Sequence, residues 1–233
     1  MKKLQMFTGA LLLKVVLIGA CTKIDNYALP GETLIGKVID KNTGEPLQTA
    51  TYDVMIRLDE LSWSDNPEPY RFSIKPDGSF SNTKVFAGSY RVTPVDGPFH
   101  PIDGKELEIN GIAEVSFEVE PFLNIDVIDM QQSGGKVTAR FRISSSSDAY
   151  KVTDAQLFVA NTSFVSDGSN IPALKRSLDL SGRPNAEIYA DELEIVTEGL
   201  ASGRTYYVRV GARVDDPISR KYNYSEVFEL RIP

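Results

Sequence analysis

The stretch "GLASGRTYYVRVGAR", residues 199–213, decides the fold of the C-terminal half of this 233-residue chain. Its second part alternates apolar and polar residues, which is typical of a β-strand with one buried face. We expect Leu200 to cap a core, Gly203 to permit a sharp corner, and Tyr206 to bury its ring while its hydroxyl bonds to nearby backbone. The residues expected to face inward are Val208, Val210 and Ala212. The residues expected to face outward, free for a partner, are Tyr207, Arg209 and Arg213.

The spacing L-x-x-G-x-x-Y-x-V-x-V-x-A in this stretch resembles the turn into strand F of a fibronectin type III-like sandwich, in which Tyr206 would be the tyrosine corner. Upstream, "LNIDVIDMQQSGGKVTARFRIS" predicts a hairpin around Gly134 and Gly135. Downstream, "NYSEVFELRIP" is expected to form the last strand. Residues 122–233 are therefore predicted to be one immunoglobulin/fibronectin type III-like sandwich.

The preceding segment, residues 33–121, also has the pattern of a β-sandwich. "TLIGKVIDKNTGEPLQTATYDVMIRL" contains two β-branched runs around a polar turn, and "EVSFEVEPF" alternates cleanly. The elements "GKVIDKNTGEPL", "DGSF" and "GSYRV" resemble, in this order, a transthyretin-like, carboxypeptidase-regulatory-like domain, a type that is usually noncatalytic. We therefore predict an all-β protein: two antiparallel β-sandwich domains in tandem, joined near Pro121, with almost no helix after the N-terminal segment.

The N-terminal segment "MKKLQMFTGALLLKVVLIGAC" reads as an export signal, because two lysines precede an apolar run too short to span a bilayer. Its end, "LIGAC", resembles the lipobox of bacterial lipoproteins, which implies that Cys21 is acylated. Residues 1–20 would then be the signal peptide, and residues 21–32 the lipidated cysteine and a tether. The alternative is that Cys21 is a free or buried thiol.

The whole arrangement resembles an uncharacterised family of two-domain lipoproteins associated with starch-utilisation-like outer-membrane glycan-uptake systems. The resemblance implies an outer-membrane location, with the lipid bilayer, glycan and transporter components as partners. It implies no reaction. The formal charge of −7 argues against nucleic acid as a partner.

No catalytic residues, metal site or cofactor are predicted. His100 is the only histidine, and neither a nucleophile elbow nor a zinc-protease motif accompanies it. Calcium binding by the acids of "VDDP" or "WSDNPEP" stays open, although neither has the spacing of an EF-hand loop.

Trp63 and Tyr70 bracket the loop "WSDNPEPY" and are the best candidates for ligand binding, because aromatic rings stack on the apolar faces of sugars. The alternative is that Trp63 packs against its own core. Two function hypotheses follow: a noncatalytic surface lipoprotein that binds glycan, or a structural subunit that spaces and docks envelope proteins. An exposed indole would favour the first, and a buried one the second.

Overall fold

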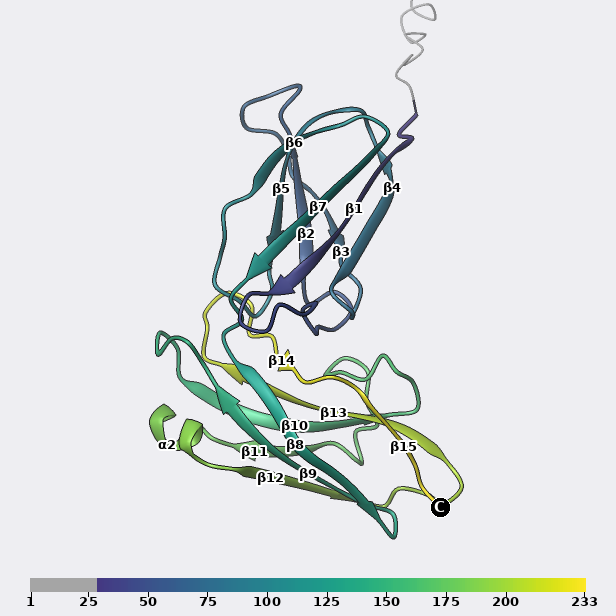
Figure 1. The fold of residues 1–233 in the computed structure, drawn as a ribbon, viewed down its shortest axis with the longest axis vertical. Coiled ribbons are helices and arrows are strands. Elements are labelled where there is room, and N and C mark those ends of the chain that lie inside the picture. The colour runs from purple at the N-terminus through teal and green to yellow at the C-terminus, as the bar shows by residue number, and fades with distance from the viewer. Residues whose placement is uncertain (1–28) are drawn as a thin grey trace, which may run out of the picture. The chain divides into compact units, whose positions relative to one another are not determined.

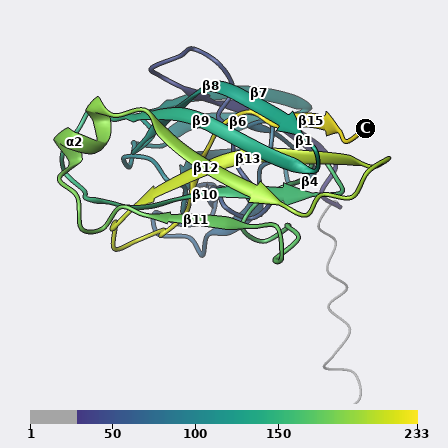
Figure 2. The same ribbon diagram turned by 90° about the horizontal axis from the view of Figure 1, so that it is seen from below.

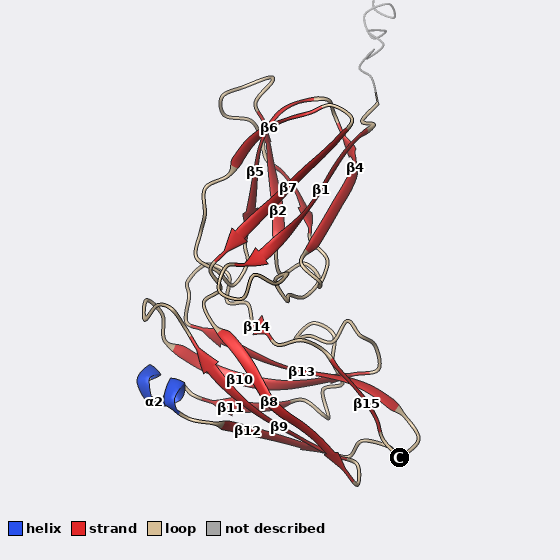
Figure 3. Ribbon diagram, in the orientation of Figure 1, coloured by secondary structure: helices blue, strands red, loops and turns tan. Residues whose placement is uncertain are grey.

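The computed structural model describes residues 29–233, and the predicted signal peptide and Cys21 lie outside this range (Figure 1). Nearly all the regular structure is β-strand, with one short helix, α2 (Asn185–Ala190), in the described residues (Figure 3). The all-β tandem sandwich is confirmed. Among residues 29–233, no helix reaches the length and hydrophobicity that a membrane span requires.

The first sandwich consists of two sheets whose strand orders are β4-β1-β7 and β3-β2-β5-β6. Between them lies a core built around Leu34, Ile56 and Phe117. The strands are β1 (Glu32–Asp40), β2 (Met55–Glu60), β3 (Tyr70–Ser73), β4 (Ser79–Val85), β5 (Gly88–Val95), β6 (Lys105–Ile109) and β7 (Ile112–Val119).

One strand pair of the first sandwich is parallel, in a fold otherwise built from antiparallel pairs. β1 runs beside β7 in unbroken parallel register, from Thr33 opposite Ile112 to Asp40 opposite Val119. The alternation of residues 114–119 correctly predicted which side chains of β7 point into the core, with Phe117 and Val119 fully buried. Alternation carries no information about strand direction, because side chains alternate equally in both kinds of pair.

The second sandwich has the sheet β12-β9-β8 and a larger sheet in which β11, β10 and β13 are neighbours and both β14 and β15 pair with β13. Figure 2 shows α2 at one end of these strands. The strands are β8 (Asn124–Ser133), β9 (Lys136–Ser144), β10 (Val152–Ala160), β11 (Arg176–Asp179), β12 (Leu193–Glu198), β13 (Thr205–Val214), β14 (Asn223–Tyr224) and β15 (Phe228–Arg231).

The single last strand expected over residues 223–233 is interrupted. Tyr224 pairs with Gly211 and Phe228 pairs with Val208, so four steps on one strand face three on the other. This is one extra residue, the geometry of a β-bulge, which bends the chain and divides it into β14 and β15. The Ser225 hydroxyl accepts a 3.1 Å hydrogen bond from the Val210 N–H at the bend.

The corner before β13 has the geometry that its spacing predicts. Tyr206 is 4% exposed, and its hydroxyl accepts a 3.1 Å hydrogen bond from the Ala201 N–H. Gly203 has φ +78°, a value that suits glycine, and its N–H donates to the Ile232 carbonyl over 2.9 Å. Leu200 is buried in the same core.

The prediction of a free outer face on β13 is wrong at Arg209, whereas Tyr207 and Arg213 on the same face are half-buried. The inward set is right, since Val208, Val210 and Ala212 are fully buried, but Arg209 on the opposite face is only 2% exposed. That face is covered by a cluster in which Ala50 of the first sandwich packs with Phe158, Tyr222 and Tyr224. Alternation shows which residues share a face, but not what covers that face.

We expect Tyr206→Ala to destabilise the protein far more than Tyr207→Ala. Loss of the buried ring of Tyr206 should cost about 3–5 kcal/mol, whereas Tyr206→Phe, which removes only the hydroxyl, should cost about 1 kcal/mol. Tyr207 is only partly buried, at the margin of the cluster on the other face. Urea unfolding midpoints measure the difference, and equal midpoints for the two alanine variants would contradict the assigned register.

Candidate functional site

Trp63 and Tyr70 lie on one hairpin of the first sandwich, in the loop and strand that follow β2. Leu58 of β2 pairs with Tyr70 of β3, so residues 61–69 form the loop at this end. Trp63 is 64% exposed and Tyr70 is 55% exposed. The structure therefore places the indole at the surface rather than in the core.

The hairpin loop is held in place by polar contacts. The Trp63 Nε1–H donates to the Glu60 carboxylate. The Ser62 hydroxyl accepts a 2.8 Å hydrogen bond from the Ser89 N–H, and the Leu61 N–H donates to the Ser89 carbonyl over 2.8 Å. These contacts tie the loop to β5 and so restrict the positions that the indole can take.

Beside the loop, Tyr70 is supported by a neighbouring ring. Its ring stacks on that of Phe72, with centroids 6.2 Å apart and planes inclined by 29°. Phe72 in turn makes an edge contact with the buried ring of Phe80 at 6.1 Å. The Tyr70 ring is thus connected to the core through the rings of Phe72 and Phe80, while the outer part of the Tyr70 ring stays exposed. Such a ring can stack on the apolar face of a sugar.

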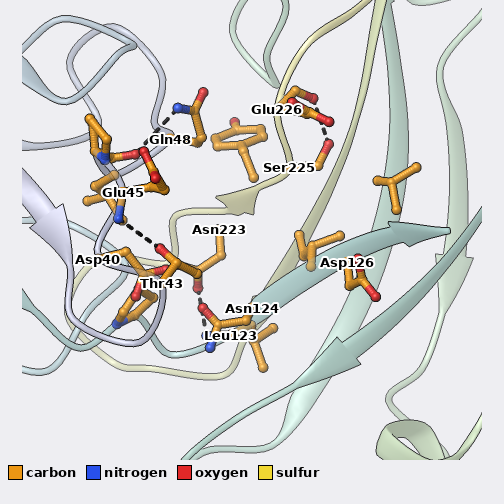
Figure 4. Close-up of a pocket in the computed structure, with 16 residues that line it drawn as sticks. Asp40, Thr43, Glu45, Gln48, Leu123, Asn124, Asp126, Asn223, Ser225 and Glu226 are labelled. Atoms are coloured by element: carbon orange, nitrogen blue, oxygen red, sulfur yellow. Dashed lines mark hydrogen bonds between the residues drawn. The ribbon is translucent and has the colours of Figure 1, made fainter.

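A groove of about 480 Å³ separates the loop after β1 from the start of β8 (Figure 4). The polar side chains that line it include Glu45, Gln48, Asn124, Asp126 and Glu226. Asn223 also lines it, but its amide is already used: Oδ1 accepts from the Leu123 N–H and Nδ2 donates to the Pro98 carbonyl. The groove therefore offers hydrogen-bonding groups, and the one aromatic side chain that lines it, Tyr224, is buried.

A polar network is buried on the outer face of β10 and β13. The Asp154 carboxylate accepts hydrogen bonds from the Tyr222 hydroxyl at 2.7 Å, Gln156 Nε2 at 2.9 Å and Arg213 Nε at 2.6 Å. Burial alone would raise the pKa of Asp154, but these three donors outweigh it and hold the pKa below its ordinary value. Burial and the bond to Asp154 raise the pKa of Tyr222, so its hydroxyl remains a donor.

Sequence reasoning did not find this network. The two tyrosines of "KYNYSE", Tyr222 and Tyr224, are both buried. Their rings pack with that of Phe158 at 5.3 and 5.9 Å. No periodicity links residues 154, 156, 213 and 222, because they meet only through the pairing of β10 with β13 and the loop that follows.

His100 and the loop acids have structural contacts. The His100 ring lies edge-on to Phe122, with centroids 5.0 Å apart, and stacks on Tyr150 at 6.1 Å. Asp216 of "VDDP" accepts hydrogen bonds from the backbone of its own loop. Within residues 29–233, no three His, Cys, Asp or Glu side chains cluster closely enough to hold a metal ion.

Comparison with known proteins assigns the chain to a family. Residues 32–120 match the N-terminal domain of a protein of unknown function, DUF3823, and residues 123–229 match the domain of unknown function DUF3823_C. The chain belongs to the DUF3823 family. Among curated proteins, none matches this sequence.

Solved structures include relatives of this DUF3823 chain along nearly its full length. A DUF3823 family protein from Bacteroides uniformis is 33% identical, with a TM-score of 0.79 over 88% of this chain and 100% of the other. Two more share the fold at lower identity. A "putative carbohydrate binding protein" from Bacteroides uniformis is 22% identical, with a TM-score of 0.75 over 87% of this chain and 100% of the other. A DUF3823 family protein from Parabacteroides merdae is 21% identical, with a TM-score of 0.72 over 88% and 100%.

The buried Asp154 carboxylate predicts a pH dependence of stability. Because its folded-state pKa lies below the ordinary value of 3.8, its contribution is present above that value and is lost as the pH falls through the folded-state pKa. Asp154→Asn should lower the free energy of unfolding by about 2–3 kcal/mol at neutral pH and flatten its decline in acid. Urea unfolding of both proteins between pH 7 and roughly pH 2 tests this. Parallel pH profiles would mean that Asp154 makes no such contribution.

Proposed function

We propose that this DUF3823 protein is a noncatalytic lipoprotein of the cell envelope that binds glycan through Trp63 and Tyr70. The observation that carries the proposal is the exposure of both rings on one hairpin. The description of one solved relative, 22% identical, as a "putative carbohydrate binding protein" supports it.

The chemistry of the hairpin suits a weak glycan contact. The C–H groups on one face of a sugar ring pack against an aromatic ring, while the hydroxyls at its edge need hydrogen-bonding groups. Near Trp63 in the sequence are Glu60, Ser62, Ser64 and Asp65, whose side-chain oxygens can accept such hydrogen bonds. An open surface of this size contacts only one or two sugar units. It therefore favours long glycan chains, because each chain offers many units that can occupy the site.

The proposed attachment is through acylated Cys21 to the outer membrane. A lipid anchor there would keep the two sandwiches beside the transporter components of a polysaccharide uptake system. The resemblance of "LIGAC" to a lipobox supports this attachment. Each buried methylene of an acyl chain adds roughly 0.8 kcal/mol, so several chains hold a protein permanently.

A second candidate function is that of a structural spacer that docks to a transporter or another envelope protein and binds no glycan. The buried contacts between the two sandwiches favour it, because Arg209 of β13 donates a 3.0 Å hydrogen bond to the Thr49 carbonyl of the first sandwich. A rigid pair of sandwiches would hold a partner at a fixed distance.

Glycan binding is tested by removing the exposed rings. We expect Trp63→Ala and Tyr70→Ala each to weaken retention on a polysaccharide at least about tenfold, since stacking on an aromatic ring supplies about 1.4 kcal/mol or more. Phe164→Ala, which removes an exposed ring from the second sandwich, is the matched control and should bind as the wild type does. Affinity electrophoresis in gels that contain starch, xylan, galactomannan or polygalacturonate measures retention. Failure of the wild type to bind any glycan, there and on a glycan array, favours the spacer.

Anchorage is tested separately at the cysteine. We expect Cys21→Ser to move the protein from the membrane fraction to the soluble fraction while both sandwiches stay folded, because the acyl group would be the attachment. Membrane flotation with circular dichroism of the released protein measures both properties. A variant that still floats with membranes after a carbonate wash would contradict the proposed anchor.

A further inference from the structure

A second cavity, of about 340 Å³, is lined by residues of both sandwiches on the side of the protein that carries the loop before β2. The first sandwich contributes Tyr52 and Asp53, and the second contributes Asp167 and Lys221. The buried rings of Tyr222 and Tyr224 also line it. Its volume lies within the range of small-molecule sites.

Tyr52 is an unusual residue for its position. Its φ is +68°, in the left-handed region that favours glycine and that a bulky side chain adopts only at a cost of order 1–3 kcal/mol. Its ring is 73% exposed, so burial does not offset the cost. The backbone is held there by a 3.0 Å hydrogen bond from the Tyr52 N–H to Ser73 Oγ. Neither the turn nor the core explains why a tyrosine occupies this position.

The opposite wall of the cavity is also built on a strained turn. Arg220 has φ +51°, and its N–H donates to the Asp216 carboxylate over 2.9 Å. The same carboxylate accepts from the Ile218 and Ser219 N–H groups, at 2.9 and 2.8 Å. Among residues 29–233, three non-glycine residues have positive φ, and two of them line this cavity.

Charged groups of both signs line the walls. Asp53 and Asp167 line it together with Arg220 and Lys221, and Lys221 Nζ lies 3.1 Å from the Asp53 carboxylate. Lys175, which is not part of the lining, places its Nζ 3.4 Å from the Asp167 carboxylate. Burial raises the pKa of Asp53, against the lowering effect of Lys221. Below these groups, the Tyr224 hydroxyl accepts a 3.2 Å hydrogen bond from the Asp167 N–H.

We propose that this cavity is a second glycan subsite, in which the ring of Tyr52 stacks on a sugar unit. The Asp53 and Asp167 carboxylates accept hydrogen bonds from its hydroxyls, and Lys221 donates to one. The inference rests on the proposed glycan-binding function and extends it to a site distinct from Trp63 and Tyr70. A neutral sugar fits this set best, since the two lining carboxylates, Asp53 and Asp167, are balanced by the two lining cations, Lys221 and Arg220, and an apolar ligand would leave the ion pairs unsolvated.

The two subsites lie at opposite ends of one strand. Tyr52 precedes β2, which begins at Met55, and Trp63 follows its end at Glu60. Six strand residues span roughly 20 Å, so the subsites are separated by several sugar units. A long glycan chain that binds at both is held more tightly than at either one, because the second contact is intramolecular.

Substitution of glycine for Tyr52 separates binding from stability. Tyr52→Gly removes the ring and relieves the left-handed strain, so we expect retention on polysaccharide to weaken at least fivefold while the thermal midpoint rises. Asp96→Gly, at the third non-glycine residue with positive φ (+65°), is the matched control for strain relief and should leave binding unchanged. Tyr52→Phe keeps the ring and should retain most of the binding.

The measurement uses the full chain and gels that contain starch, xylan, galactomannan or polygalacturonate. Trp63 is the only tryptophan, so its fluorescence reports the hairpin subsite alone. In Tyr52→Gly, a fluorescence response to polysaccharide that persists while overall retention falls supports two subsites. Retention equal to the wild type overturns the second subsite and leaves the proposed function standing, whereas loss of binding by the wild type itself overturns both.

Discussion

The buried guanidinium of Arg209 is the contact on which the arrangement of residues 31–233 as one compact unit depends. It projects from the centre of β13, lies 3.6 Å from the centroid of the Tyr224 ring and donates to the Thr49 carbonyl across the junction. Burial lowers its pKa to about 10, so it stays charged at neutral pH. A buried charge is costly unless its surroundings satisfy it. Here a π-face and a carbonyl offset part of that cost, while Nε of Arg209 has no hydrogen-bond partner among the described residues. Separating the sandwiches would break both the hydrogen bond to Thr49 and the packing of Ala50 on the same face.

The interface between the two sandwiches contains polar as well as apolar contacts. This mixture is typical of an interface between two domains of one chain and not of a single shared core. Asp53 pairs with Lys221, and Asn223 bonds to the Pro98 carbonyl, so each sandwich supplies partners for the other. Beside the linker at Pro121, the rings of His100 and Tyr150 stack on each other, and both make edge contacts with the ring of Phe122. These directional contacts fix the angle between the sandwiches, which apolar packing alone specifies weakly.

The contacts between the two sandwiches determine whether one of the two proposed glycan subsites can form. The cavity beside Tyr52 exists only because the loop before β2 and the loop before β14 are held against each other. The hairpin of Trp63 lies at the other end of β2, where the first sandwich alone builds it. The proposed subsite at Trp63 therefore needs only the first sandwich, whereas the proposed subsite at Tyr52 needs both sandwiches.

The sequence by itself determined the all-β class, the two sandwiches, the corner at Tyr206 and the candidate ring at Trp63. Each of these depends on local spacing: alternation, a glycine at a turn, or an aromatic residue in a polar loop. Only the tertiary structure decided the parallel pairing of β1 with β7, the burial of Arg209 and the strained backbone of Tyr52. These features depend on which distant segments meet and on what covers a strand's second face. Residues 49, 209 and 224 carry no mark of their contact in the sequence, because the physical cause of that contact is packing between elements, not the order of residues within one.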